Sequence, residues 1–139
     1  MSRFVDSNIW LYAYIASGDD QAKHLRARRA IEGHPDPLTI SDQVITEVAA
    51  NLLRKGRLPE VDVMTRLQDM TGRCRVLRVD LAVHTRAHAL RLSDPSVCSY
   101  WDSLIIAAAL ESGCSEVWSE DLQAGRVIDG RLTIVNPLA

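Results

Sequence analysis

Four acidic residues that lie far apart in the chain carry the side chains best suited to chemistry. They are Asp6 in RFVDSN, Glu47 in ITEVA, Asp102 in YWDSLIIAAA and Asp121 in WSEDL. Each follows an expected strand or lies among the apolar residues of an expected helix, so folding could bring them together. Carboxylates gathered in one pocket repel one another unless a hard cation neutralises them. Such a cluster is how proteins hold Mg²⁺ or Mn²⁺ for cutting phosphodiester bonds.

Each acid taken alone also has a plainer structural explanation. Asp6 and Asp102 could cap the start of a helix, and the helix dipole would stabilise Asp102 by roughly 0.3–1 kcal/mol. Asp121 could cap the segment after its strand. A Glu in the second turn of a helix, such as Glu47, is usually solvated. Four caps need not share one edge of one sheet, so the four acids together favour a common site.

Short apolar strands alternate with helices along the chain. Strands are expected at 3–6, 38–41, 74–79, 116–119 and 132–135, and helices at 7–17, 20–32, 42–56, 59–72, 81–93 and 100–113. This alternation implies a largely parallel sheet covered on both faces. Ligands of such folds bind beyond the carboxyl ends of the strands, where the strand order reverses. Asp6 and Asp121 both come just after an expected strand, which places them at that edge.

Length and composition favour one domain over residues 1–139. The chain has 139 residues, of which 47% are hydrophobic, enough for one proper core. It has no apolar run of membrane-spanning length and no signal peptide, so we expect a cytoplasmic protein without a membrane association. Its three cysteines are an odd number without CxxC spacing, which favours buried thiols over disulfides.

The charge pattern bears on nucleic-acid binding. A net charge of −2 argues against a generally basic coat. Arginine-rich clusters at 26–29, 54–57 and 73–78 could still contact phosphates, although helix surfaces routinely carry such runs.

Aromatic and histidine residues offer two further patterns. Five aromatic residues could stack on bases, although core packing or a subunit contact is the usual role for most: Trp10, Tyr12, Tyr14, Tyr100 and Trp101. His84 and His88 have the spacing of a zinc pair, but no matching ligand motif accompanies them, so a partly exposed helix face is expected.

Four segments together resemble a PIN domain, and most closely the VapC-type toxins of type II toxin–antitoxin pairs. They are FVDSNIWLYAY, ITEVAANLLRKG, YWDSLIIAAALESGC and VWSEDLQAGRVIDGRLTIVNP. The resemblance spans essentially the whole chain, with the four acidic motifs in order. It implies a three-layer α/β/α sandwich around a five-stranded, mainly parallel sheet. It also implies Mg²⁺- or Mn²⁺-dependent endoribonuclease activity.

The resemblance assigns roles to individual residues. Asp6, Glu47, Asp102 and Asp121 match the catalytic, metal-binding acids, and Asn8 and Ser119 match the polar residues that support them. Because the fourth motif reads SED, Glu120 could share the role of Asp121. The resemblance further implies an RNA substrate, a cognate antitoxin that occludes the active groove, and a homodimer.

Three other functions stay open from the sequence. A phosphatase-like hydrolase with an acidic pocket usually shows a DxD motif or a nearby lysine, whereas this chain has DSN. A DNA nuclease of the same fold would use the same acids. A non-catalytic RNA- or protein-binding module would need a broken acidic set, and here the set is intact.

Overall fold

The sheet at the centre of the molecule has six strands, five of them parallel. The computed structural model describes residues 2–16, 18–94 and 99–139. The strands are β1 (Arg3–Val5), β2 (Leu38–Ser41), β3 (Cys74–Leu77), β4 (Glu116–Trp118), β5 (Val127–Ile128) and β6 (Leu132–Val135). Their order is β3-β2-β1-β4-β6-β5, and β5 alone runs antiparallel to its neighbour.

All five expected strands are present, but the expected number of five was too low by one. The extra strand β5 is only two residues long and pairs with β6. It lies between Gly125 and the tight turn at Asp129 and Gly130, three residues with positive φ. A strand this short has no periodic pattern from which it could be predicted. The mainly parallel character of the sheet is as expected.

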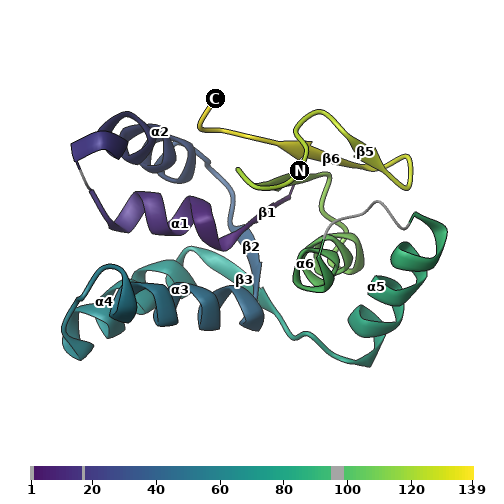
Figure 1. Ribbon diagram of the computed structural model, residues 1–139, viewed down its shortest axis with the longest axis horizontal. Coiled ribbons are helices and arrows are strands. Elements are labelled where there is room, and N and C mark those ends of the chain that lie inside the picture. The colour runs from purple at the N-terminus through teal and green to yellow at the C-terminus, as the bar shows by residue number, and fades with distance from the viewer. Residues whose placement is uncertain (1, 17, 95–98) are drawn as a thin grey trace.

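Helices cover both faces of the sheet and complete three layers. They are α1 (Ser7–Tyr14), the 3-10 turn η1 (Gly18–Asp20), α2 (Gln21–Glu32), α3 (Asp42–Arg54), α4 (Glu60–Gly72), α5 (Leu81–Ser93) and α6 (Tyr100–Glu111). Figure 1 shows α1 to α4 on one side of the sheet and α5 and α6 on the other. The six expected helices are therefore all present; α1, α3 and α6 end two or three residues earlier than expected, and the other three end where expected.

Helix α6 is the most deeply buried helix. Every residue from 103 to 110 is buried, as its almost unbroken apolar run predicts. Ser99 caps its start by accepting a hydrogen bond from the backbone N–H of Asp102. Gly113 follows its end with φ at 74°, the left-handed conformation expected of a C′ glycine.

The strand order reverses between β1 and β4. From β1 the chain adds β2 and β3 on one side, and later adds β4 and β6 on the other. The two strands separate just beyond a hydrogen bond from the backbone N–H of Asp6 to the carbonyl of Trp118. Residues that follow β1 and β4 therefore meet at the crevice where such folds bind ligands.

The described residues include two of the three cysteines. Cys114 is buried, and Cys74 is a free, half-buried thiol whose pKa burial raises to about 12. Cys98 lies outside the described residues. Over the ranges that the structure describes, no helix is both long enough and apolar enough to cross a membrane.

Candidate functional site

Asp6 is a buried carboxylate at the point of strand reversal. It caps α1, and its side chain is only 5% exposed. One oxygen, Oδ1, accepts from the backbone N–H of Ser7 at 2.7 Å, and Oδ2 accepts from the hydroxyl of Ser119 at 2.8 Å. Burial raises the pKa of Asp6 to about 6; the two hydrogen bonds oppose this rise, and the charges of Glu47 and Asp102 add to it. Asp6 is thus the expected cap of α1, and burial of its charged form costs free energy.

Glu47 faces the same crevice from helix α3. Its Oε1 is buried and has no hydrogen-bond partner among the described residues. Burial raises the pKa of Glu47; the polar side chains of Ser7 and Gln43 oppose the rise, and the charge of Asp102 adds to it. A buried acceptor without a partner costs free energy that a bound cation would recover. Glu47 is therefore not the solvated helix residue that its position alone suggested.

Asp102 completes a group of three acids that interact through their charges. It lies in the first turn of α6, and its negative charge raises the pKa of both Asp6 and Glu47. Because Ser99 supplies the cap of α6, Asp102 has no capping role there. The capping explanation, open from the sequence, does not apply to this residue.

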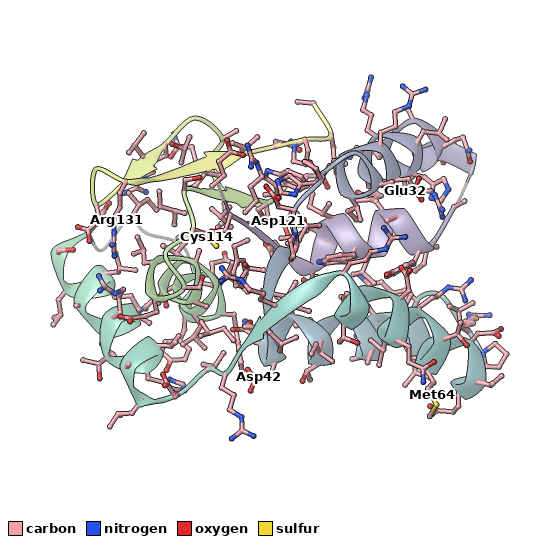
Figure 2. The ribbon with its side chains drawn as sticks, turned by 180° about the vertical axis from the view of Figure 1, so that it is seen from behind. Glu32, Asp42, Met64, Cys114, Asp121 and Arg131 are labelled. Carbon is pink, nitrogen blue, oxygen red and sulfur yellow. The ribbon has the colours of Figure 1, made fainter. Side chains whose placement is uncertain are left out.

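Asp121 is tied to the start of α1 through Asn8 and Ser119. The amide Nδ2 of Asn8 donates to Oδ2 of Asp121 at 3.0 Å, and the buried hydroxyl of Ser119 accepts from the backbone N–H of Asp121 at 3.2 Å and of Leu122 at 3.3 Å. Figure 2 shows Asp121 beside α1, near the centre of the molecule. No helix follows Asp121, so it is not a cap either.

Glu120 points its carboxylate toward α1 and α2. Its Oε1 accepts from the hydroxyl of Tyr12 at 3.0 Å, and its Oε2 pairs with the Lys23 ammonium at 2.6 Å. Its backbone N–H donates to Oδ1 of Asn8 at 3.3 Å. Both carboxylate oxygens of Glu120 are therefore engaged, whereas Asp121 keeps one oxygen beyond its bond to Asn8.

The acids have the chemistry of a site for a hard cation, although they do not form a closed ligand set. Among the described residues, no three His, Cys, Asp or Glu side chains are close enough to hold a metal ion as they stand. The donors are all carboxylate oxygens, which Mg²⁺ and Mn²⁺ prefer, and Mg²⁺ usually keeps several waters and needs only one or two carboxylates. The Oε1 of Glu47 has no partner among the described residues, and the buried Asp6 carboxylate lies within reach of the charges of Glu47 and Asp102, so a cation would suit the residues present.

Two cavities adjoin the acids, and residues of α3 line both. One has a volume of about 460 Å³ and is lined by Asn8, Lys55 and Asp121, among others. The other, about 630 Å³, lies between α3 and the start of α6 and includes Glu47. Asn51 lines both.

Sequence reasoning missed the polar neighbours of Glu47 on α3. Gln43 and Asn51 stand four residues before and after Glu47, which places all three on one face of the helix. The Nδ2 amide of Asn51 donates to the Glu47 carbonyl at 2.8 Å, and Asn51 and Gln43 line the cavity that Glu47 enters. The four-residue spacing was a signal that could have found them.

Comparisons with known proteins agree with this fold. The family model of the PIN domain matches residues 3–129. No curated protein sequence matches the chain significantly.

Several solved structures with a similar fold come from toxin–antitoxin systems. They include VapC20 of Mycobacterium tuberculosis, a toxin that cleaves the sarcin-ricin loop, with 20% identity, coverage of 86% of this chain and 91% of that chain, and a TM-score of 0.68. A toxin–antitoxin complex from Klebsiella pneumoniae has 18% identity, 97% coverage of both chains and a TM-score of 0.71. VapBC2 from Rickettsia felis, bound to a DNA fragment from its promoter, has 16% identity, 98% coverage of both chains and a TM-score of 0.67. At these identities the likeness is one of fold.

Proposed function

Because this chain belongs to the PIN domain family, we propose that it is a metal-dependent endoribonuclease that hydrolyses phosphodiester bonds of RNA. The observation that carries the proposal is the group of Asp6, Glu47 and Asp102 at the strand reversal. Asp6 is buried with a raised pKa, Glu47 has a buried oxygen without a partner among the described residues, and the charge of Asp102 acts on both. A cation at this place would relieve all three.

Asp6, Glu47, Asp102 and Asp121 are the residues that would hold Mg²⁺ or Mn²⁺. Such an ion, when bound, lowers the pKa of a coordinated water and offsets charge on the phosphoryl group. The protein supplies orientation: Ser119 and Ser7 fix the Asp6 carboxylate, and Asn8 fixes that of Asp121. The Glu120 carboxylate is engaged by Tyr12 and Lys23 and would not hold the ion. No histidine or lysine lies directly beside any of the four acids in the sequence, so the acids would act by holding the ion and not by assisting a histidine or lysine nucleophile.

The biological role that we propose is that of a toxin in a type II toxin–antitoxin pair. Similar folds occur in toxin–antitoxin complexes from Klebsiella pneumoniae and Rickettsia felis. The chain would then act on RNA in the cytoplasm, form a homodimer, and be held inactive by a cognate antitoxin that covers the acidic crevice. A short gene with a DNA-binding N-terminal region directly upstream would support this role.

Cleavage of nucleic acid with and without metal tests the enzymatic proposal. The purified protein is incubated with a mixed-sequence pool of single-stranded RNA, or with DNA of the same sequences, in Mn²⁺ or in EDTA. We expect cleavage of RNA in Mn²⁺ alone. Cleavage of DNA in preference to RNA would show that the protein is a DNA nuclease. RNA cleavage that persists in EDTA would show that the reaction does not require a metal ion.

A further inference from the structure

The 630 Å³ cavity beside the acids contains an exposed indole. Glu47 and Gln43 line it from α3, and Trp101 and Leu104 line it from the first turns of α6. Trp101 is 63% exposed, whereas the other two tryptophans, Trp10 and Trp118, are 0% and 7% exposed. Single exposed apolar side chains are common on protein surfaces, so exposure alone decides nothing. The position and support of this one are more informative.

The indole of Trp101 is braced by the neighbouring ring of Tyr100. The ring of Tyr100 meets it edge-on, with centroids 6.2 Å apart. Tyr100 is itself fixed, because its hydroxyl lies 3.1 Å from Nδ1 of His84, the His88 ring lies 5.6 Å away and the Arg91 guanidinium lies 5.8 Å from its centroid. His84 and His88 thus support an aromatic ring, which accounts for their spacing without zinc. A braced indole loses little conformational freedom when a flat ligand stacks on it.

The cavity adjoins the acids directly. Asp102 is the next residue after Trp101, and Glu47 is a wall of the same cavity. The side-chain amide of Gln43 on α3 donates to the Trp101 carbonyl at 3.3 Å. This bond links the two helices that line the cavity. A ligand held at the acids would therefore extend onto the indole.

The charges of the cavity decide which part of an RNA chain it can accept. Its acidic walls are the carboxylates of Asp42 and Glu47, which repel phosphate, and His84 also lines it. The Asp42 carboxylate is held in place, since its Oδ1 accepts from the backbone N–H of Val79 at 3.0 Å. Carboxylate and amide oxygens accept hydrogen bonds from the N–H groups of a base edge. The cavity thus suits a base and disfavours the backbone.

We propose that this cavity binds one unpaired nucleobase of the RNA substrate, stacked on Trp101, next to the phosphodiester that the acids hold. The proposal rests on the proposed ribonuclease function and extends it, because it makes Trp101 a substrate-binding residue. It also restricts the substrate to single-stranded or flipped-out nucleotides, since a paired base cannot leave its stack to reach the indole.

Substitutions of Trp101 in the full chain test the proposal. The matched control is Met64→Ala, because Met64 on α4 is 60% exposed and lies far from Asp42 and Asp121 in Figure 2. With single-stranded RNA and Mn²⁺, Trp101→Ala should lower kcat/KM by roughly tenfold or more, as expected for loss of one base–aromatic stack. Trp101→Phe should recover most of the loss, and Met64→Ala should cleave like the wild type.

Tryptophan fluorescence gives a readout that does not need cleavage. Because the other two indoles are buried, RNA added in Ca²⁺ should quench the exposed one, and Trp101→Phe should abolish that quenching. If the wild type cleaved no RNA, the proposed function would be wrong. Quenching of the Trp101 fluorescence by RNA would in that case still support base binding in the cavity. Normal cleavage by Trp101→Ala, together with quenching that does not depend on Trp101, would overturn the base-binding proposal and leave the proposed function standing.

Discussion

Burial controls the charge of Asp6 in the metal-free protein. The pKa of Asp6 is raised from 3.8 to about 6 in the fold, mainly by loss of water. The folded state therefore binds the proton more tightly than the unfolded chain does. This contribution to stability is fully present below about pH 4 and is lost as the pH rises to and beyond about 6. The loss amounts to about 3 kcal/mol, at 1.36 kcal/mol per pKa unit.

The variant Asp6→Asn should remove this pH dependence. Asparagine carries no charge, so in EDTA at pH 8 its free energy of unfolding should exceed that of the wild type by up to about 3 kcal/mol, and at pH 4 the two should be similar. Urea unfolding at both pH values measures this. Asp36→Asn, at an exposed loop residue, serves as the control. If the stability of both variants depended on pH as that of the wild type does, ionisation of Asp6 would not destabilise the fold.

Ser119 holds the crevice together through one hydroxyl. It donates to Asp6 and accepts from two backbone N–H groups, those of Asp121 and Leu122. Ser119→Ala should lower the free energy of unfolding by about 1–3 kcal/mol, because buried donors lose their acceptor. Ser93→Ala, at an exposed serine whose hydroxyl bonds the Leu90 carbonyl, should change it little. Equal unfolding midpoints in urea for the two variants would contradict this role.

At the scale of residues, the sequence indicates which acids form the site but not the separate roles of neighbouring residues. Asp6 and Asp121 were both expected at one edge of the sheet. The roles of Glu120 and Asp121 could not be separated, because the partner of Glu120 is Lys23 on a distant helix. Tertiary contacts of this kind leave no local pattern.

Helix α6 shows what the sequence can predict for a whole element. Its burial and its start near Asp102 were expected, because an almost unbroken apolar run is a local signature of burial on every side. The glycine after its end is a second local signature, that of C-terminal capping. The short strand β5 has no such signature, and its existence depends on pairing with β6. Long patterned elements are therefore predictable here, and pairing-dependent ones are not.

The end of α6 offers a test at the scale of the element. Gly113 has φ at 74°, so Gly113→Ala should lower stability by roughly 1 kcal/mol. Gly72, at the end of α4, has open space where a Cβ would lie, so Gly72→Ala should be neutral or stabilising by about 0.4–1 kcal/mol. Thermal unfolding of both variants measures the difference. Equal melting temperatures would show that the left-handed turn does not constrain residue 113.

For the molecule as a whole, the fold and the acids suggest that metal binding stabilises the chain. A ligand that binds only the folded state adds about 2.7 kcal/mol at a concentration of 100 times Kd. Mn²⁺ should therefore raise the melting temperature of the wild type, and Asp102→Asn should lose most of the rise. Glu120→Gln is the matched control, because the Glu120 carboxylate is engaged by Tyr12 and Lys23. An identical rise in all three proteins would place the ion elsewhere.

Cleavage of single-stranded RNA by the wild type, Asp6→Asn and Glu120→Gln, in the same Mn²⁺ buffer, tests the central claim most directly. Circular dichroism first establishes that all three proteins are folded. We predict that the wild type and Glu120→Gln cut RNA and that Asp6→Asn does not, because Asp6 is the buried acid at the strand reversal. RNA cleavage by Asp6→Asn at the wild-type rate would contradict the claim that these carboxylates form the active site.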